Sequence, residues 1–331
     1  MIRHTPSPAA APASAEVAVV TDDDVHATVT VAEVAAALEQ AFEALAHGRA
    51  SILPRQRIDC GPVKLSGMGA IWLDAGLAGQ KVYPTVDGQF GFLMTLFDTR
   101  SGQPLAVFPG QALTALRTPA LTLAALRRAL SHGTSRPRKL ALFGAGHQGR
   151  AHLQALLSAL PFDEVAVVDP QDPTAACAAW REAFGRDIHA ASAEAAVRGA
   201  DAVVTVTRSK TPVFDGRWLK PGATVAAIGT SLPSGRELDD TTLARAARVV
   251  VEWKPQSLVE AGEVVLGLQS GALQPERIVD WTDLVQGRDT WRRDDDEIVV
   301  FKSVGVGLSD LAAASLAWAA RSGRPACTSP A

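Results

Sequence analysis

The stretch of residues 139–152, KLALFGAGHQGRAH, decides the fold of this chain. Its apolar run at residues 140–143 is typical of a buried strand, and the sequence AHLQALLSAL that follows predicts a helix. Gly144, Gly146 and Gly149 between them form a G-x-G-x-x-G pattern. In that context the first glycine permits a tight turn, the second lets the backbone approach a pyrophosphate, and the third lets the helix pack on the strand. The helix N-terminus favours the negative charge of the pyrophosphate, so the stretch predicts a dinucleotide site.

A second apolar run, at residues 164–168, ends in Asp169, about 20 residues after the last glycine of the pattern. A carboxylate at this place accepts hydrogen bonds from an adenosine ribose 2′-OH and repels a 2′-phosphate. Residues 170–172 (PQD) offer no arginine to balance that phosphate. NAD(H) is therefore expected in preference to NADP(H). The predicted contacts in this stretch are Gly144, Ala145, Gly146, His147, Gln148, Gly149 and Asp169.

Strands and helices alternate beyond Asp169. Strands are predicted at residues 188–190, 202–206, 223–228, 248–251 and 297–301, with helices at 174–184 and 193–197. Such alternation indicates an α/β fold with a parallel, doubly wound sheet of the Rossmann type. Ligands bind these sheets at the carboxyl ends of the strands, so Thr207 and Gly229 are expected to border the cofactor.

The first part of the chain has a different pattern. Residues 30–33 (TVAE) fit a capping box, and helical spacing continues to Gly48. Short runs broken by Gly, Pro and Asp between residues 51 and 107 predict a meander or hairpin sheet. An alanine-rich helix follows to about residue 130, residues 131–138 read as a linker, and residues 309–321 predict an amphipathic helix. A second, mixed α+β domain is expected.

Length and composition narrow the classes of protein. The 331 residues, 47% of them hydrophobic, suffice for one large or two medium domains. A formal net charge of −3 gives no reason to expect nucleic acid or an anionic membrane as partner. Three scattered cysteines show no metal or disulfide spacing and suit a cytoplasmic protein. No apolar run has the length of a membrane span, and residues 1–16 read as a disordered extension.

Several separated motifs occur in a fixed order around the glycine pattern. They are RQRID at residues 55–59, GQKV at 79–82, GQPLA at 102–106, LRT at 116–118, and VFKSVG at 300–305 with Asp310. Together they resemble the ornithine cyclodeaminase/mu-crystallin family over nearly the whole chain, residues 17–321. The resemblance implies a homodimer whose substrate-binding and dimerisation domain comprises residues 17–130 plus 303–325, with the Rossmann domain at 131–302.

The resemblance also implies site residues. Cations that bind a substrate carboxylate fall on Arg55, Lys81 and Arg117. The forked guanidinium suits a carboxylate, and a buried lysine shifts its pKa readily enough to serve near a reacting nitrogen. Arg57 is an alternative to Arg55. Thr118, Lys302 and Ser303 join the expected cofactor contacts.

One position departs from the cyclodeaminases. Those members carry an aspartate in a G-x-D-x-P-type segment, where residues 229–233 (GTSLP) here place Ser231. Mu-crystallin, a ketimine reductase, is similar in having serine there. A serine hydroxyl is a poor base at neutral pH without a partner, which argues against cyclodeamination. Ser231 either caps the turn before Pro233 or contacts substrate.

The sequence therefore predicts an NAD-dependent reductase of a ketimine or cyclic imino acid, or an amino-acid dehydrogenase. Lys81 and Ser231 are the candidate catalytic residues, the substrate is a small imino or amino acid, and no metal is expected. Two alternatives stay open: ornithine cyclodeaminase, and a non-catalytic NAD(P)H-binding protein similar to a crystallin.

Overall fold

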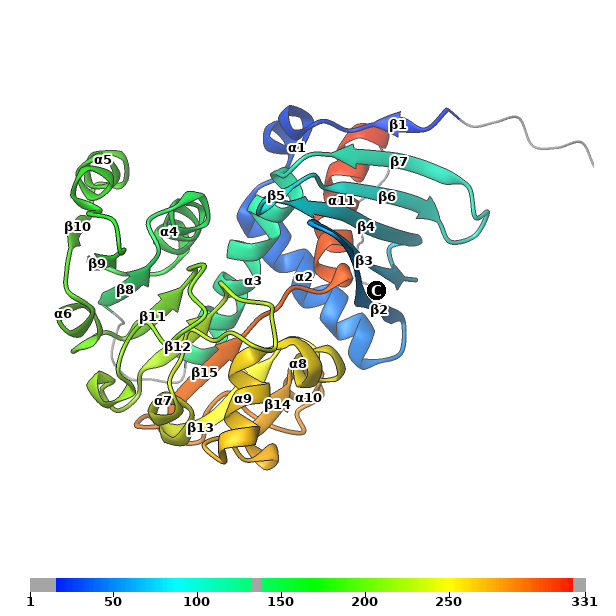
Figure 1. Cartoon of the computed structure of the whole chain (residues 1–331). Coiled ribbons are helices and arrows are strands. Elements are labelled where there is room, and N and C mark those ends of the chain that lie inside the picture. The colour runs from blue at the N-terminus through cyan, green and yellow to red at the C-terminus, as the bar shows by residue number, and fades with distance from the viewer. Residues whose placement is uncertain (1–15, 132–137, 324–331) are drawn as a thin grey trace, which may run out of the picture.

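The structure is a computed structural model that describes residues 16–131 and 138–323. Two β-sheets lie side by side, a parallel one and a mixed one, each with its own helices (Figure 1). The α/β class and the second mixed sheet expected from the sequence are both confirmed. Most of the predicted extension and of the predicted linker lies outside the described residues.

The parallel sheet contains eight strands in the order β10-β9-β8-β11-β12-β15-β13-β14. Their bounds are β8 (Lys139–Phe143), β9 (Glu164–Val168), β10 (Asp187–Ala190), β11 (Ala202–Thr205), β12 (Thr224–Ala227), β13 (Ala246–Val251), β14 (Ile278–Asp280) and β15 (Ile298–Lys302). All neighbours pair in parallel. The chain runs from β8 outward to β9 and β10, then returns to place β11 on the other side of β8. The strand order thus reverses between β8 and β11, where such sheets bind ligands.

Helices flank the parallel sheet on both faces (Figure 1). They are α4 (His147–Ala159), α5 (Thr174–Phe184), α6 (Ala193–Val197), α7 (Asp240–Arg245), α8 (Lys254–Glu260), α9 (Gly262–Ser270) and α10 (Trp281–Val285), with 3-10 turns η1 (Gly216–Trp218) and η2 (Pro275–Arg277). The strands of this sheet are almost fully buried because both faces are covered. This burial explains their nearly continuous apolar sequences.

The mixed sheet has the order β1-β7-β6-β4-β3-β2, with β5 beside β4. Its strands are β1 (Ala18–Val19), β2 (Ala50–Cys60), β3 (Val63–Trp72), β4 (Leu77–Val86), β5 (Gln89–Phe90), β6 (Leu93–Asp98) and β7 (Pro104–Pro109). Apart from the parallel pair of β1 and β7, the strands form the expected antiparallel meander.

The two faces of the mixed sheet differ. On the inner face, Met68 and Trp72 are buried against the helices α11 (Gly307–Ser322) and α2 (Val31–Ala46). The outer face carries apolar side chains that are more than a third exposed: Leu53, Ile58, Leu65, Ile71, Leu93 and Phe97. Alternation along each strand produces this division, since successive side chains point to opposite faces.

Helices α3 (Ala112–Leu130) and α11 join the two parts. Helix α3 packs on α2 and α11 and also contacts α4 and β12. Helix α11 follows β15, so the chain leaves the parallel sheet and returns to cover the mixed one. The expected capping box is present at the start of α2, where Thr30 and Glu33 exchange hydrogen bonds. Within the described ranges, no helix is both long and apolar enough to cross a membrane.

Several elements were not predicted. Helix α1 (Asp22–Thr28) starts with its own capping box, formed by Thr21 and Asp24. Helices α7 to α10 and strand β14 were also missed, because elements of three to nine residues are too short to show a period. These elements include α8, which brings an acid to the site described next.

Candidate active site

The glycine loop has the geometry that a dinucleotide requires. Gly144 has φ of +106°, and a Cβ on Gly149 would lie 2.0 Å from the Gly144 carbonyl oxygen. A Cβ on Gly146, in contrast, would meet no described atom within 4 Å. The first and third glycines therefore serve the fold itself, while the second leaves open space at the start of α4. This space fits a pyrophosphate that approaches the backbone.

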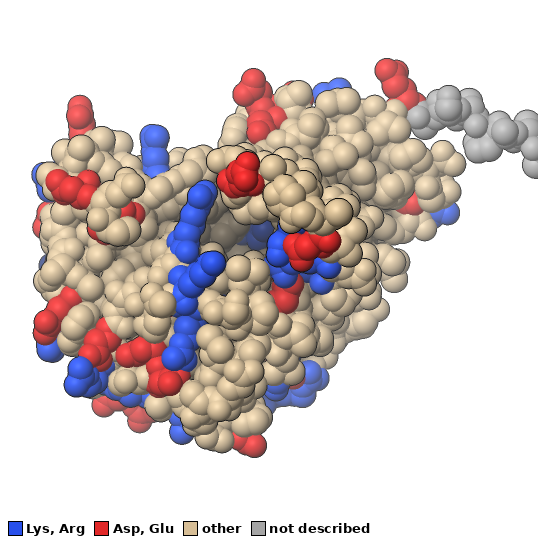
Figure 2. Space-filling model, in the orientation of Figure 1, with Lys and Arg blue, Asp and Glu red and all other residues tan. Residues whose placement is uncertain are grey.

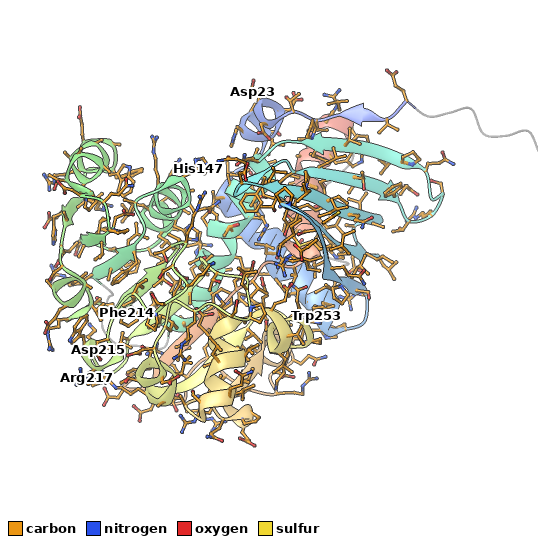
Figure 3. The ribbon with its side chains drawn as sticks, viewed as in Figure 1. Asp23, His147, Phe214, Asp215, Arg217 and Trp253 are labelled. Carbon is orange, nitrogen blue, oxygen red and sulfur yellow. The ribbon has the colours of Figure 1, made fainter. Side chains whose placement is uncertain are left out.

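Asp169 lies directly after β9 and beside the loop. Its Oδ2 accepts a hydrogen bond of 2.8 Å from the Ala145 N–H, and its Oδ1 accepts one of 2.9 Å from the Gln171 N–H. Each carboxylate oxygen retains capacity for a further donor, such as a ribose hydroxyl. His147 begins α4 on the side that faces the mixed sheet (Figure 3). Gln148 follows it in the first turn of the helix.

A buried carboxylate holds the ends of β11 and β12 together. Glu237 Oε1 accepts from the backbone N–H and the hydroxyl of Thr207, at 2.8 and 2.7 Å. Its Oε2 accepts from the Thr205 hydroxyl at 2.9 Å and from the Gly229 N–H at 2.7 Å. Thr207 and Gly229 therefore lie together at the strand ends, as expected, although no sequence signal had assigned Glu237 a role.

Of the remaining predicted cofactor contacts, Lys302 and Ser303 are buried. Lys302 is fully buried; it pairs with Glu263 at 3.0 Å and donates to the Thr230 carbonyl at 2.7 Å. Ser303 donates to Glu252. These contacts make Lys302 a support of the strand-end turn, and its burial disfavours a direct contact with cofactor. Thr118 lies on α3, where its hydroxyl donates to the Thr114 carbonyl.

Two of the three predicted substrate cations share one buried acid. Lys81 Nζ and Arg117 Nε each lie 3.0 Å from Asp310 Oδ1, and the Asp310 side chain is completely buried in the first turn of α11. The other oxygen, Oδ2, has no hydrogen-bond partner within the described part of the chain. Lys81 also donates to the Thr114 hydroxyl. We call Lys81, Arg117 and Asp310 the inner cluster.

Burial and charge shift two pKa values in the inner cluster. Burial lowers the pKa of Lys81 to about 8; Asp310 opposes this shift and Arg117 adds to it. The Lys81 ammonium also lies 4.1 Å from the centre of the Phe92 ring. Burial disfavours the Asp310 carboxylate, but Arg117 and Lys81 outweigh it and hold the pKa of Asp310 below its usual value. A lysine with this pKa is able to give up a proton near neutral pH.

The third predicted cation, Arg55, belongs to a second group. Its Nη1 donates to Glu260 at 2.8 Å, and its Nη2 donates to the carbonyls of Val304 and Gly305. Arg57 pairs with the other oxygen of Glu260 and lies 3.3 Å from both Ser231 O and Ser231 Oγ. We call Arg55, Arg57 and Glu260 the outer cluster. Ser231 is thus next to a cation from the mixed sheet.

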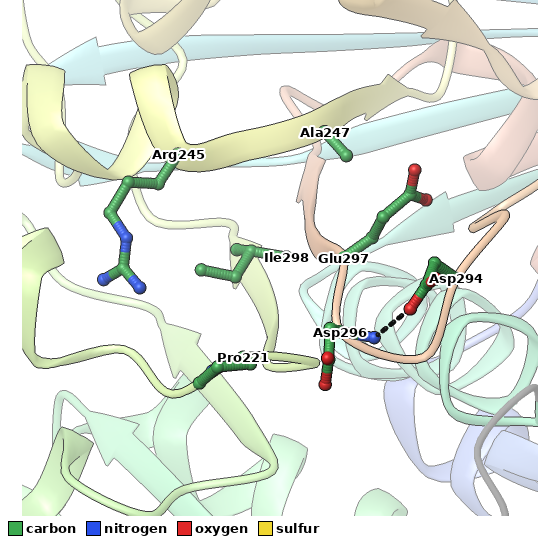
Figure 4. Close-up of a pocket in the computed structure, with 7 residues that line it drawn as sticks. All are labelled: Pro221, Arg245, Ala247, Asp294, Asp296, Glu297 and Ile298. Atoms are coloured by element: carbon green, nitrogen blue, oxygen red, sulfur yellow. Dashed lines mark hydrogen bonds between the residues drawn. The ribbon is translucent and has the colours of Figure 1, made fainter.

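A hollow with Lys or Arg atoms in it opens between the two parts of the molecule (Figure 2). The contacts through Asp310, the Gly305 turn and Arg57 bring Arg55, Lys81, Arg117 and Ser231 to one region, beside the carboxyl end of β12. A separate hollow lies at the opposite edge of the parallel sheet, at the start of β13 and β15 (Figure 4). It contains the acidic turn at Asp294 and Asp296, which are joined by a 2.9 Å hydrogen bond.

In the described residues, no group of three or more His, Cys, Asp or Glu side chains could hold a metal ion.

Among the acids of this site, the sequence assigned a role to Asp169, marked Asp310 only as part of a family motif, and gave no role to Glu260. Asp310 carried a further signal, because it is the single acid in α11. Glu260 had none, since α8 itself was missed.

The fold and the loop define a two-part, dinucleotide-binding protein of the Rossmann class. The model of the ornithine cyclodeaminase/mu-crystallin family matches residues 15–320, so the chain belongs to this family. The resemblance seen in the motifs is confirmed.

Two relatives of known activity illustrate the family. A Bacillus cereus Δ1-pyrroline-2-carboxylate reductase is 31% identical over 223 residues, which are 66% of this chain and 67% of the relative. Mouse ketimine reductase mu-crystallin is 33% identical over 228 residues, 67% of each chain. Both are reductases of C=N bonds by name.

Two solved structures are similar along almost their full length. A probable ornithine cyclodeaminase from Bordetella pertussis is 40% identical, with a TM-score of 0.88 over 94% of this chain and 100% of that one. The Thermococcus litoralis Δ1-pyrroline-2-carboxylate reductase, in complex with NADH and L-proline, is 25% identical. Its TM-score is 0.85 over 93% of this chain and 98% of that one. The NADH in the latter supports the cofactor predicted from Asp169.

Proposed function

We propose that this protein is an NAD-dependent reductase of a C=N bond next to a carboxylate, in a ketimine or cyclic imino acid. The observation that carries the proposal is the inner cluster: two cations share one buried carboxylate beside the strand ends of a dinucleotide fold. The cluster has one positive charge in excess, which suits a substrate carboxylate. The reductases among the relatives support the same reaction.

The chain's own residues would perform the following steps. Arg117 and Lys81 bind and orient the substrate carboxylate, and Arg55 supports them through the Gly305 backbone. NADH, when bound at Gly144–Gly149, supplies the hydride that adds to the imine carbon. Lys81 Nζ supplies the proton that the imine nitrogen gains, which its pKa of about 8 permits. The C=N bond thereby becomes CH–NH, and orientation by the cations lowers the barrier further.

Asp169 supports the choice of NADH over NADPH, because a carboxylate beside the glycine loop after β9 would accept from the ribose hydroxyls and repel a 2′-phosphate. Comparison of kcat/KM for the two reduced cofactors tests this point. We expect a clear preference for NADH, which Asp169→Ser weakens while Asp172→Asn, on the adjacent surface turn, leaves it intact. A native preference for NADPH would contradict the assignment.

We also propose that the protein is a cytoplasmic homodimer made of a substrate-binding domain (17–130 plus 303–325) and a Rossmann domain (131–302). The exposed apolar outer face of the mixed sheet supports a second copy as the partner of that face. Sedimentation measurements should give a dimer that Ile58→Glu weakens. A native monomer would refute this assembly.

The decisive experiment mixes purified protein with NADH and Δ1-pyrroline-2-carboxylate. Oxidation of NADH with formation of proline supports the reductase. Formation of proline and ammonia from ornithine, without net change in NADH, would instead support the cyclodeaminase, which the Bordetella relative keeps open as an alternative. Binding of NADH with neither reaction would support a crystallin-like binding protein.

A further inference from the structure

The inner and outer clusters are parts of one continuous array of charges. Arg55 Nη2 donates to the Gly305 carbonyl at 2.7 Å, and a Cβ on Gly305 would lie 2.9 Å from Arg117 Nη1. Arg117 and Arg55 both help to lower the pKa of Lys81 through their positive charge. The array therefore runs from β4 in the mixed sheet, past the turn after β15, to Ser231 after β12.

Each cluster has two cations and one carboxylate, so each carries one positive charge in excess. Glu252 is another buried acid near Arg117; burial raises its pKa, and the Arg117 charge opposes that rise. Its carboxylate is already engaged by the N–H groups of Val304 and Gly305 and by the Ser303 hydroxyl. A single substrate carboxylate balances the excess positive charge of one cluster, and the excess positive charge of the other remains.

The unbalanced charge of the outer cluster is accessible at Arg57. The Arg57 side chain is 19% exposed, compared with 3% for Arg55, whose terminal nitrogens are filled by Glu260 and two carbonyls. Arg57 reaches Ser231 with 3.3 Å contacts, which are longer than those of a strong charge-assisted hydrogen bond. A carboxylate that enters beside Ser231 would give Nη2 of Arg57 a charged acceptor in place of the two Ser231 oxygens, while Nη1 keeps its pair with Glu260.

We propose that Arg57 is a specificity-determining residue that selects an imino acid with a second carboxylate, bound beside Ser231. This inference rests on the proposed function, because it assumes that the inner cluster holds the first carboxylate. The second carboxylate would complete the charge balance of the array. A cationic tail, such as the ammonium of ornithine, would face the excess charge and be repelled.

Two open-chain imines of equal length test the inference. They form in solution from ammonia with 2-oxoglutarate, which has an anionic tail, or with 2-oxopentanoate, which has a neutral one. We expect the native protein to show a kcat/KM for NADH oxidation at least about tenfold higher with 2-oxoglutarate. Arg57→Gln should bring this ratio close to one.

Three comparisons isolate the charge of Arg57. Arg57→Lys keeps the charge and should keep more of the ratio than Arg57→Gln. Arg49→Gln is the matched control, because Arg49 pairs with Asp74 at the surface away from both clusters, and it should leave the ratio unchanged. Calorimetric binding of glutarate and of pentanoate in the presence of NAD⁺ should show the same ratio and the same loss, independently of turnover.

The inference is overturned if the ratio is the same in native protein and Arg57→Gln while both activities fall together, since Arg57 would then only join the two parts. A native preference for the neutral tail overturns it as well. Failure of the proposed function would appear differently, as absence of NADH oxidation with any imine, and the binding ratio would still decide the role of Arg57.

Discussion

Lys81 donates a 3.0 Å hydrogen bond to Asp310 from the opposite end of the chain, and both side chains are buried. Burial and the Arg117 charge lower the pKa of Lys81, and the Asp310 carboxylate limits this decrease. If protonated Lys81 supplies the proton in imine reduction, kcat/KM should fall as pH rises through about 8.

Asp310→Asn removes the charge that favours protonated Lys81. The pKa of Lys81 should then decrease, and the alkaline fall of kcat/KM should move to lower pH by about one unit or more. A pH profile of kcat/KM for both proteins measures the shift. Asp74→Asn, which alters a surface pair, is the control and should not move the profile. An unchanged profile in Asp310→Asn would mean that Lys81 is not the titrating donor.

Arg117→Ala should impair substrate binding without affecting cofactor. A charge-assisted bond to a carboxylate contributes roughly 1.5–3 kcal/mol, so kcat/KM for the imine should fall by at least about tenfold. The Kd for NADH, measured by fluorescence, should change little. Arg128→Ala on the same helix pairs with Glu39 at the surface and serves as control. Loss of NADH binding with retained imine binding would show that Arg117 belongs to the cofactor site.

Alanine at the second and third glycines of the loop should have separable effects. Gly146→Ala adds a methyl group to open space, so the thermal unfolding midpoint should stay close to native while NADH binding weakens. Gly149→Ala forces a methyl group against the Gly144 carbonyl and should lower the midpoint as well. Thermal scans and NADH titrations of the two variants test this contrast. Equal midpoints would contradict the assigned roles.

His152 should make the fold sensitive to acid. It is fully buried between α4 and α3, where Nδ1 contacts the Gln148 carbonyl at 2.8 Å and Nε2 contacts the Thr122 hydroxyl at 3.0 Å. Burial lowers its pKa from 6.5 to about 4. Below pH 6.5 His152 therefore binds a proton in the unfolded chain but not in the folded one. The free energy of unfolding decreases as pH falls towards 4.

The decrease should amount to at most roughly 3 kcal/mol in the free energy of unfolding. Urea unfolding between pH 7 and 4.5 measures it. His152→Gln should flatten the dependence, whereas His189→Gln, at a side chain 38% exposed, should not. Equal pH dependence in native protein and His152→Gln would exclude this explanation.

The parts of this molecule that could be predicted from the sequence depend on short-range signals. The glycine loop, the helix α5 and the acid after β9 each follow from residues close together in the chain. The alternation of short apolar strands with helices predicted the parallel sheet, since each of these elements is also recognised from neighbouring residues. The predicted ends of these strands differ from the observed ones by at most two residues, because the pairing partner decides where a strand ends.

Of the candidate site, the cations could be predicted but their contacts could not. The resemblance placed Arg55, Lys81 and Arg117, and the structure brings them together. The pairing of these cations with their acids could not be predicted, since Lys81 and Asp310 are 229 positions apart and Arg55 and Glu260 are 205 apart. No local pattern carries such a pairing. The contact of Arg57 with Ser231 was missed for the same reason, although both residues had been singled out.

The return of α11 to the mixed sheet has a consequence for biosynthesis. Strands β2 to β7 precede the whole parallel sheet in the chain, and α11, the helix that covers them, follows it. During synthesis the inner face of the mixed sheet, with Met68 and Trp72, therefore stays uncovered by α11 until the parallel sheet has been made. Exposed apolar surface of this kind binds chaperones and promotes aggregation. A nascent chain truncated before residue 307 should be protected from proteolysis in its parallel sheet while β2 to β7 remain susceptible.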